Sequence, residues 1–335
     1  MKNYSLGIDT SNYTTSVAVT DQSGFVVCDK RIMLKVKEGK RGLRQQEALF
    51  QHICNLPELL NDVLNDETRG RIAVVAVSSR PRPREDSYMP CFKAGQTAGT
   101  AVSAALGVPY REYSHQEGHI AAVDRSDDDT FLSYHLSGGT CELLNVRKLM
   151  TSAEDKAYDI EIIGGSQDIS IGQLLDRVGV AMGFRFPAGQ TLDEIAMNTH
   201  NDRKVKEKKD LLTGVKIRDL WFGLSGLETQ VLRNLGKIRN GEQNEPSSES
   251  PYRLNDLEKE MIYELFKRIT ALLIKETRAA RKITGVSKVI FAGGVSKSSF
   301  IRNELRNNLE DIDFGEYSED NAVGISLLGG RYLWR

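Results

Sequence analysis

Apolar and polar positions follow two different periods along this chain. Short runs that alternate, or that are wholly apolar and end at turn residues, predict β-strands, whereas longer stretches with apolar residues three or four positions apart predict helices. The predicted strands are residues 4–11, 15–20, 25–31, 72–78, 108–113, 131–137, 141–147, 158–163 and 287–292. The predicted helices are residues 44–64, interrupted near Pro57, then 93–106, 115–123, 170–183, 191–199, 225–238, 254–283, 297–310 and 320–332. The mixture indicates an α/β protein.

A polar break at residues 124–129 divides this pattern into two halves. Each half opens with three short predicted strands and continues into helices, which we interpret as a weak internal repeat. A charge run at 201–210 and a flexible segment at 239–251 are expected to be solvated connections. The length of 335 residues is large for one hydrophobic core and agrees with two domains.

Composition narrows the class of protein. An apolar content of 40% and a charged content of 27% are typical of a soluble globular protein, and the net charge of −1 supplies no overall basic field for nucleic acid. The N-terminus carries no signal-peptide pattern, and no stretch approaches the 18 apolar residues of a membrane span, so no membrane partner is expected. Four scattered cysteines predict reduced thiols and a cytoplasmic location.

Three turns that follow predicted strands have the composition of phosphate-binding turns. They are Thr10-Ser11-Asn12, Ser137-Gly138-Gly139-Thr140 and Gly293-Gly294-Val295-Ser296. Glycine allows the backbone to approach an anion, and the third turn enters a helix whose N-terminus favours negative charge. Any one of them is explained as well by ordinary hairpin chemistry. Together they fit a nucleotide held between two halves, although the dinucleotide and P-loop glycine motifs are both absent from the sequence.

His115 and His119 stand four residues apart, so a helix would place both imidazoles on one face. This spacing suits half of a metal site, and it suits equally a pair that only caps or coats a helix. A catalytic metal needs a third ligand, and the sequence offers too many carboxylates to choose from. The pattern departs from the zinc-protease motif because Gln116 follows the first histidine and Glu117 comes one position late.

Other charged residues have both a functional and a structural interpretation. Asp9 ends a predicted buried strand, where a charge is costly without a task, and the alternative is an aspartate that only caps a turn. Asp176 lies inside a predicted helix, where a solvated or ion-paired position is the alternative. The proline-stiffened segment with Arg80, Arg82 and Arg84 suits an anionic substrate or a solvated loop. Lysines of the 201–210 run are interpreted as wet surface.

Seven motifs, in order along the chain, make it resemble the TsaD type of tRNA threonylcarbamoyladenosine transferase family. They are LGIDTS at 6–11, HQEGH at 115–119, LSGGT at 136–140, LLDRVGVAMGFRFPAG at 174–189, LSGLET at 224–229, AGGVS at 292–296 and EDNAVGI at 319–325. The resemblance implies two ribonuclease-H-like domains of the actin, sugar-kinase and heat-shock-ATPase architecture with a nucleotide and metal cleft. We expect the domains at 1–125 and 126–319, with a final helix at about 320–335 returning to the first.

The resemblance also implies roles for single residues. His115, His119 and Asp320 would hold Fe²⁺ or Zn²⁺ beside the phosphate end of ATP or an acyl-adenylate. Residues implied in holding that nucleotide are Ser137, Gly138, Gly139, Asp176, Gly189, Asp193, Gly293, Gly294 and Ser298. The positions implied in catalysis are Asp9, Thr14 and Thr140. The chemistry implied is transfer of a carbamoyl-type group from an adenylate to an amine.

The chain departs from its relatives on the acceptor side. Tyr13 and Thr14 replace two acids, Thr140 replaces a histidine, and Ser298 replaces an asparagine. Glu228 stands where relatives have lysine, and SRPRPRED replaces a glycine-rich loop. These changes leave open whether the acceptor is tRNA or a small-molecule amine, and whether a related partner subunit is needed. The alternative is a non-catalytic paralogue that binds nucleotide or a sister subunit, against which the retained His115, His119 and Asp320 argue.

Overall fold

A computed structural model describes residues 2–11, 13–36, 43–84, 86–124, 128–149, 156–202, 211–241, 254–317 and 322–334. The proposed metal ligand Asp320, the turn residue Asn12 and most of the 201–210 charge run lie outside these ranges. The chain forms two compact units, which are described separately. Unit 1 comprises Met1–Thr130, Val146–Ile160 and Gly315–Arg335, and unit 2 comprises Phe131–Asn145 and Glu161–Phe314. Val146–Ile160 thus groups with unit 1, although the sequence places it within the second predicted domain.

Unit 1 is built on a five-stranded sheet with the order β3-β2-β1-β4-β5. Its strands are β1 (Tyr4–Asp9), β2 (Thr14–Asp21), β3 (Val26–Met33), β4 (Ile72–Arg80) and β5 (Tyr110–Ser114). The first three strands are antiparallel neighbours, β4 is parallel to β1, and β5 is parallel to β4. The carboxyl ends of β1, β4 and β5 therefore meet at one edge, which is where ligands bind in open α/β sheets.

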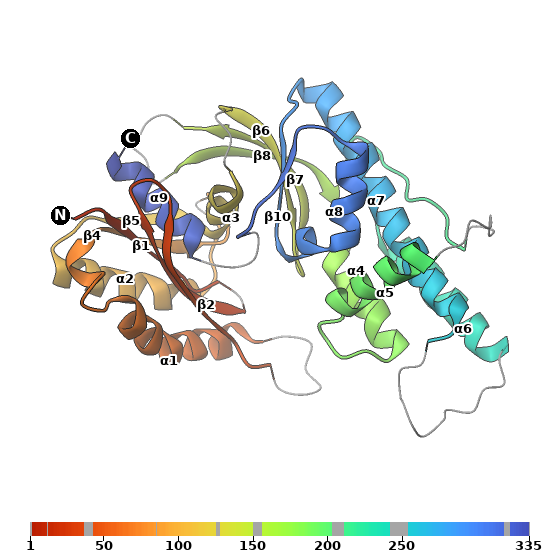
Figure 1. Ribbon diagram of the computed structural model, residues 1–335, viewed down its shortest axis with the longest axis horizontal. Coiled ribbons are helices and arrows are strands. Elements are labelled where there is room, and N and C mark those ends of the chain that lie inside the picture. The colour runs from red at the N-terminus through yellow and green to blue at the C-terminus, as the bar shows by residue number, and fades with distance from the viewer. Residues whose placement is uncertain are drawn as a thin grey trace. The chain divides into compact units, whose positions relative to one another are not determined.

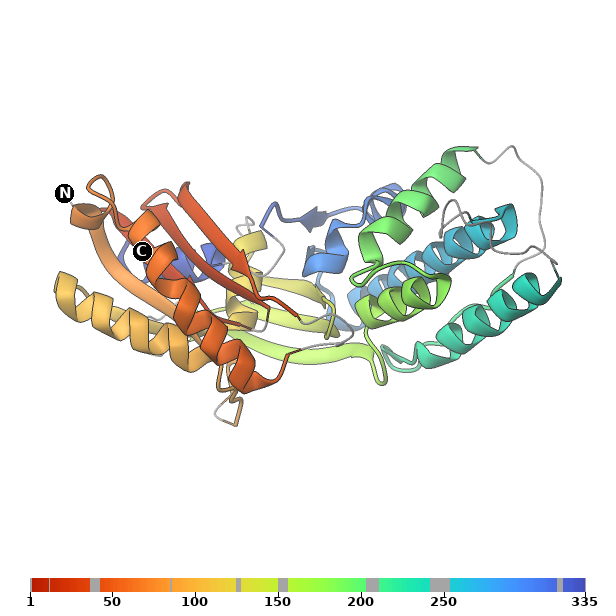
Figure 2. The same ribbon diagram turned by 90° about the horizontal axis from the view of Figure 1, so that it is seen from below.

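Helices cover both faces of this sheet (Figures 1 and 2). They are α1 (Gln45–Val63), α2 (Phe92–Leu106), α3 (His115–Val123) and α9 (Val323–Trp334), with a short 3₁₀ helix η1 (Arg69–Arg71) before β4. Side chains alternate along β1, so Leu6 and Ile8 enter the core under α1 and α2 while Ser5 donates a hydrogen bond to Ser326 of α9. The last helix thus completes the core of the first unit.

Helix α1 continues through Pro57, so the predicted interruption there is wrong. Proline removes one backbone donor, which deprives the carbonyl of residue 53 of its helical partner. Both Ile53 and Pro57 lie on the exposed face of α1, where water can bond that carbonyl. Leu56, Leu59 and Val63 are buried on the opposite side, and their burial offsets the missing hydrogen bond.

Unit 2 contains a six-stranded sheet with the order β11-β10-β6-β7-β8-β9. Its strands are β6 (Thr130–Leu136), β7 (Cys141–Lys148), β8 (Tyr158–Ser166), β9 (Trp221–Phe222), β10 (Val289–Ala292) and β11 (Ile312–Phe314). Strand β10 is parallel to both β6 and β11. Strands β9 and β11 are absent from the sequence prediction because two or three residues are too few to display an alternating pattern.

The two sheets share one topology. With the edge strand β9 set aside, the order β8-β7-β6-β10-β11 matches β3-β2-β1-β4-β5 strand for strand, with the same parallel pairings in the second half of each. The internal repeat predicted from the sequence is confirmed. It follows that the loop after β1 corresponds to the loop after β6, and the loop after β4 corresponds to the loop after β10.

The helices of unit 2 surround one hydrophobic cluster. They are α4 (Ile171–Met182), α5 (Gly189–Asp202), α6 (Ser225–Gly241), α7 (Asp256–Thr284) and α8 (Ser299–Asn308), with a 3₁₀ helix η2 (Gly294–Lys297) before α8. The single helix predicted at 297–310 is thus preceded by a 3₁₀ turn. No helix in the described part of the chain is long and apolar enough to cross a membrane.

Candidate metal and nucleotide site

Asp9 ends β1 and is fully buried, so its carboxylate depends on hydrogen bonds. Its Oδ1 accepts from the Ser11 amide at 3.1 Å and from the Ser78 hydroxyl. Its Oδ2 accepts from the Ser11 hydroxyl at 2.9 Å and from His115 Nδ1 at 3.0 Å. Asp9 therefore joins the ends of β1 and β4 to the first residue of α3.

His115 and His119 face each other on α3, as the spacing predicts. Because Asp9 Oδ2 accepts from Nδ1 of His115, the Nε2 atom of that ring is directed away from the carboxylate. It lies 2.9 Å from Nε2 of His119, and the two rings meet edge to face with centroids 4.3 Å apart. Two imidazole nitrogens therefore converge on one point at the carboxyl edge of the sheet.

This arrangement fits a divalent metal ion. Nitrogens 2.9 Å apart can both reach one ion at bond lengths of about 2.0–2.1 Å, and metal-binding histidines ordinarily donate their other N–H to a carboxylate, as His115 does to Asp9. Among the described residues, no group of three or more histidine, cysteine or carboxylate side chains gathers around one point. Two candidate ligands are thus described, and the third implied by the family resemblance, Asp320, lies outside the described ranges.

Local hydrogen bonds start α3 directly at His115. Ser114 is the N-cap residue, and its side chain accepts from the Glu117 amide. The Glu117 carboxylate in turn accepts from the Ser114 amide at 2.8 Å and from the Ala157 amide at 2.8 Å, which completes a capping box. Glu117 is completely buried in this role. Its carboxylate is occupied by donors from Ser114 and Ala157, so the geometry speaks against a metalloprotease with Glu117 as general base.

Thr14, one of the two positions at which the family resemblance implies acids, is the first residue of β2 and is half-buried. Its amide donates to the Ser11 carbonyl at 3.3 Å, so it lies across the same turn that Asp9 holds.

Ser78, which donates to Asp9, belongs to the candidate site but was overlooked in the sequence analysis. The available signal was a hydroxyl at the end of the otherwise apolar run that forms β4.

In unit 2, the Ser137-Gly138-Gly139-Thr140 turn joins β6 to β7. The Ser137 hydroxyl oxygen accepts from the amides of Gly139 at 3.3 Å and Thr140 at 3.0 Å, and the Gly138 carbonyl accepts from Ser170, the N-cap of α4, at 2.9 Å. The turn is therefore fixed by its own serine and by α4. A phosphate that took these amides as donors would compete with Ser137.

The glycines predicted around the nucleotide fall into two kinds. A β-carbon on Gly293 would lie 2.3 Å from the Leu136 carbonyl oxygen, and Gly293 has a φ of +93°, so the fold itself requires glycine there. A β-carbon on Gly138, Gly139, Gly189 or Gly294 would meet no described atom within 4 Å, and their φ angles do not demand glycine. At these four positions internal packing does not account for glycine.

Two predicted nucleotide contacts, Asp176 and Gly189, lie together because Asp176 bonds the start of α5. Its carboxylate accepts from the amides of Ala188, at 2.8 Å, and Gly189. Burial raises the pKa of the Asp176 carboxyl, and these amide donors oppose the rise. Asp176 is therefore a partly buried acid at a helix N-terminus and not the solvated residue of the alternative interpretation.

Asp193 and Ser298 also lie together, at the start of α8. The Ser298 hydroxyl donates to Asp193, which also accepts from the amides of Ser299 at 2.7 Å and Phe300 at 3.1 Å. The first turn of α8, which suited a phosphate in the sequence prediction, thus holds a protein carboxylate. The roles proposed for Asp193 and Ser298 in nucleotide binding stay predictions, with helix capping as the contact that the structure describes.

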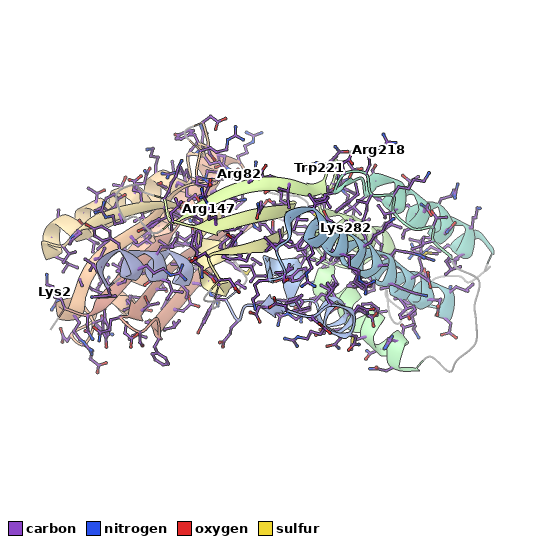
Figure 3. The ribbon with its side chains drawn as sticks, turned by 90° about the horizontal axis from the view of Figure 1, so that it is seen from above. Lys2, Arg82, Arg147, Arg218, Trp221 and Lys282 are labelled. Atoms are coloured by element: carbon purple, nitrogen blue, oxygen red, sulfur yellow. The ribbon has the colours of Figure 1, made fainter. Side chains whose placement is uncertain are left out.

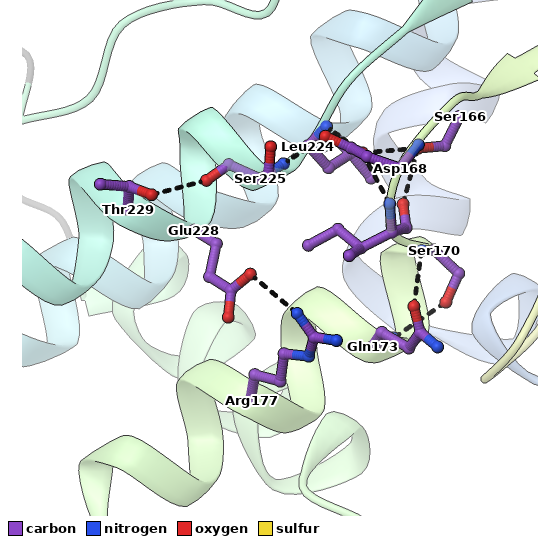
Figure 4. Close-up of polar contacts among 10 residues, drawn as sticks. Ser166, Asp168, Ser170, Gln173, Arg177, Leu224, Ser225, Glu228 and Thr229 are labelled. Atoms are coloured by element: carbon purple, nitrogen blue, oxygen red, sulfur yellow. Dashed lines mark hydrogen bonds and ion pairs between the residues drawn. The ribbon is translucent and has the colours of Figure 1, made fainter.

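A third carboxylate, that of Asp168, also accepts hydrogen bonds from amides at the start of a helix (Figure 4). Asp168 accepts from the amides of Leu224 at 2.8 Å and Ser225 at 3.0 Å, at the start of α6. Burial alone would raise the pKa of the Asp168 carboxyl, but donors from Ser225, Leu224 and Ile169 together hold it well below its usual range. Nearby, Glu228 accepts from Arg177 of α4 at 3.2 Å. Glu228, at a position where the family resemblance implies lysine, thus has a cationic partner.

Comparison with known proteins decides the family. The sequence model of TsaD, described as tRNA N6-adenosine threonylcarbamoyltransferase, matches residues 32–327 and so covers most of the chain, including His115 and His119. The chain belongs to the TsaD family. Two relatives with that description are a Sulfurihydrogenibium sp. protein, 27% identical over 92% of this chain and 83% of its own length, and a Thermotoga neapolitana protein, 26% identical over 97% and 92%.

Solved structures show the fold expected of a TsaD-family chain. HypF of T. kodakarensis aligns with a TM-score of 0.55 and 14% identity over 98% of this chain and 47% of its own. Component A of the Acidaminococcus fermentans (R)-2-hydroxyglutaryl-CoA dehydratase aligns at 0.53 and 13%, over 98% of both chains. The fold is thus the actin-like architecture of two ribonuclease-H-like domains, which agrees with the duplicated sheet topology.

Proposed function

We propose that this TsaD-family chain is a metal-dependent, nucleotide-binding transferase that moves a threonylcarbamoyl group from its adenylate to an adenosine amine of tRNA. The observation that carries the proposal is the convergence of His115 and His119, with Asp9 behind His115, inside a family match that spans most of the chain. The scattered, unpaired cysteines support a cytoplasmic setting for the reaction.

The residues of unit 1 prepare the proposed metal position. Asp9 fixes the His115 ring and its tautomer, because a buried carboxylate accepts only from a protonated Nδ1. Ser11 and Ser78 donate to Asp9 and keep it from turning toward the ion itself. When bound, Fe²⁺ or Zn²⁺ would polarise a phosphate or carbonyl oxygen and stabilise the charge that develops there. The capping box at Ser114 and Glu117 holds both imidazoles in register.

We assign nucleotide binding to residues of unit 2. We assign the close approach of phosphates or of the acyl-adenylate to Gly138, Gly139 and Gly294, since packing does not require glycine at these positions. Gly189, held by Asp176, would face the ribose and adenine side. A solved neighbour of the same fold, the activator of a Clostridium difficile dehydratase, is described with bound ADPNP. Thr14 and Thr140 are the hydroxyl groups we assign to the acceptor side.

Metal content and transfer are tested together. Purified protein is expected to carry close to one Fe²⁺ or Zn²⁺ per chain, measured by mass spectrometry of the metal. Supplied with threonylcarbamoyl adenylate and unmodified tRNA, it should yield the modified adenosine in nucleoside digests. His115→Ala and His119→Ala should remove both metal and product. His200→Ala, a histidine of α5 that stacks on Tyr263, is the matched control and should change neither.

The proposal fails if the unaltered protein holds no stoichiometric metal, or if His115→Ala leaves metal content and nucleotide binding as they were. Nucleotide binding without transfer, together with tight association with another family member, would instead establish the non-catalytic paralogue. Transfer to a small amine but not to tRNA would keep the chemistry and replace the acceptor.

A further inference from the structure

The arginine-rich loop after β4 occupies a central place at the carboxyl edge of the first sheet. Strand β4 lies between β1, which ends at Asp9, and β5, which leads into His115. Ser78 near the end of β4 donates to Asp9, and Arg80 is the register partner of Ser114. The chain that leaves β4 at Arg80 therefore starts beside the candidate metal site.

Hydrogen bonds fix this loop in place. The Pro81 carbonyl accepts from the Gln116 amide at 3.0 Å, which attaches the loop to the first turn of α3, one residue after His115. The Arg82 amide donates to the Ser87 hydroxyl at 3.0 Å, and the Ser87 amide donates to the Arg84 carbonyl at 3.1 Å. Proline at 81 and 83 restricts the backbone further. The backbone at Pro81, Arg82 and Arg84 is thus held by hydrogen bonds, which lowers the entropy cost of binding through these arginines.

The segment from residue 80 to 93 is basic in a chain whose net charge is −1. It contains the four cations Arg80, Arg82, Arg84 and Lys93 against the two acids Glu85 and Asp86. Arg84 is 64% exposed and pairs with Asp86. Lys93 is exposed on the first turn of α2, and Arg82 is half-buried (Figure 3). Tyr88 is 63% exposed in the same segment. Exposed cations beside an exposed aromatic ring are typical of surfaces that bind single-stranded or looped RNA.

The repeat gives this loop a counterpart with the opposite chemistry. The loop after β10 in unit 2 is Gly293-Gly294, which brings bare backbone to its surroundings. The loop after β4 occupies the equivalent position in unit 1 and carries long cationic side chains. A bare loop suits close contact with a small ligand, whereas a loop with several guanidinium groups suits phosphates spaced along a polymer. The two loops are therefore suited to different ligands.

We propose that Arg82, Arg84 and Lys93 bind the phosphodiester backbone of an RNA acceptor beside His115, with Tyr88 providing a face on which a base stacks. The inference rests on the proposed function in taking RNA as the acceptor. Phosphate contacts would supply the position and register of the RNA, and Arg82 and Arg84 would hold its backbone next to the histidine pair.

Binding is measured with the full chain and a fluorescently labelled tRNA transcript at several salt concentrations. Arg82→Gln with Arg84→Gln should weaken binding about 3- to 30-fold and flatten the dependence of log K on log salt by about one to two. Arg69→Gln is the matched control, because Arg69 is 62% exposed, pairs with Asp66, and lies before the opposite end of β4. It should leave affinity and slope within twofold of the unaltered chain.

The proposal is overturned if the unaltered chain does not bind tRNA, or if Arg69→Gln weakens tRNA binding as much as the Arg82/Arg84 variant does. It is also overturned if the Arg82/Arg84 variant loses ATP binding as strongly as tRNA binding, which would assign the loop to nucleotide phosphate. Thermal unfolding of each variant checks that it is folded. Loop-dependent tRNA binding without threonylcarbamoyl transfer would leave this proposal standing and contradict the proposed function. Threonylcarbamoyl transfer that is unchanged in the Arg82/Arg84 variant would contradict this proposal and leave the proposed function standing.

Discussion

Gly324 of α9 lies against the backbone of Gly118, the residue of α3 that directly precedes His119. A β-carbon on Gly324 would fall 1.8 Å from the Gly118 carbonyl oxygen and 2.6 Å from its carbonyl carbon. A β-carbon on Gly118 would meet Ile325 at 2.9 Å. Helix α3, which carries both imidazoles, is therefore held in place by direct contact with α9. The contact residue Gly324 follows Asp320 by four positions in the sequence.

Gly324→Ala should lower the free energy of unfolding by about 1–3 kcal/mol, because α3 and α9 must separate to admit the methyl group. Gly236→Ala provides the contrast, since Gly236 lies exposed in α6 with no described atom within 4 Å of its β-carbon position. That variant should gain about 0.5–1 kcal/mol from helix propensity. Urea unfolding measures both, and a Gly324→Ala protein as stable as the original would disprove the contact.

Asp9→Asn should weaken metal binding about 10- to 100-fold, as loss of a carboxylate behind a ligating histidine generally does. The amide preserves the shape but removes the charge that holds the Nδ1 proton of His115. Asp21→Asn serves as control, because Asp21 ends the neighbouring strand and accepts from Ser23 and Phe25 far from the histidines. Competition with a chelator measures the affinity. Equal loss in both variants would show a general effect of strand-end aspartates.

Asp193→Ala should cost about 1–2 kcal/mol of stability, because the amides of Ser299 and Phe300 lose their acceptor at the start of α8. If capping is its whole task, nucleotide affinity measured well below the unfolding temperature should stay within twofold. Asp168→Ala removes the corresponding acceptor from α6 and should lose a similar amount. A tenfold fall in nucleotide affinity for Asp193→Ala alone would restore the role suggested by the family resemblance.

His52 should make stability fall in mild acid. Its ring is buried, Nδ1 bonds the Thr15 hydroxyl at 2.8 Å, and Nε2 has no hydrogen-bond partner within the described ranges. Burial lowers the pKa of His52 to about 4, against a weaker opposing effect of Asp9. The unfolded chain, with a pKa near 6.5, then binds the extra proton, so stability is lost as pH falls from 6.5 toward 4, by at most about 1.4 kcal/mol per pH unit.

His52→Gln should remove this contribution, so the variant should lose less stability than the unaltered chain as pH falls from 6.5 to 4.5. Unfolding free energies from urea titrations at pH 4.5, 5.5 and 6.5 give the comparison. An acid slope of the same steepness in the variant would place the responsible group elsewhere.

Glu276 should act in the opposite direction between about pH 4.5 and 8. It lies buried on α7 and accepts from the Tyr134 hydroxyl at 3.1 Å. Burial raises its pKa to about 8, so the folded protein retains a proton that the unfolded chain, with a pKa near 4.5, releases. The stabilising effect of that proton is complete below pH 4.5 and is lost as pH rises toward 8.

Glu276→Gln, which is neutral at every pH, should remove this decline, so the loss of stability that His52 causes in mild acid should become steeper than in the unaltered chain. Thermal unfolding between pH 6 and 8.5 measures it. A wild-type protein whose stability is constant across that range would contradict the buried, protonated state of Glu276.

The order of elements was largely predictable, because period and length distinguish most strands from most helices. Predictions fell short where local pattern carries no information: Pro57 continues its helix because the far side of α1 is buried, and β9 and β11 are too short to show alternation. Whether a proline breaks a helix depends on which face meets the core, and only the folded structure supplies that.

The candidate site was predictable as a set of residues but not as a set of contacts. Asp9 and His115 were each chosen for separate reasons, yet their bond joins positions 106 residues apart. Asp193 likewise meets Ser298 across 105 residues, and a sequence cannot show that its carboxylate is taken up by a helix end. Residue type identifies what chemistry is available, whereas topology decides which donors satisfy each acid.

The placement of α9 has a consequence for the order of biosynthesis. Ser5 and Ser326 share buried hydrogen bonds across 321 residues, and the strand that carries Asp9 packs under that last helix. At translation rates of roughly 5–20 residues per second, β1 waits roughly 15–60 s on the ribosome before its covering helix is made. The first unit is begun first and finished last, so a polypeptide released early would lack the support on which the histidine helix rests.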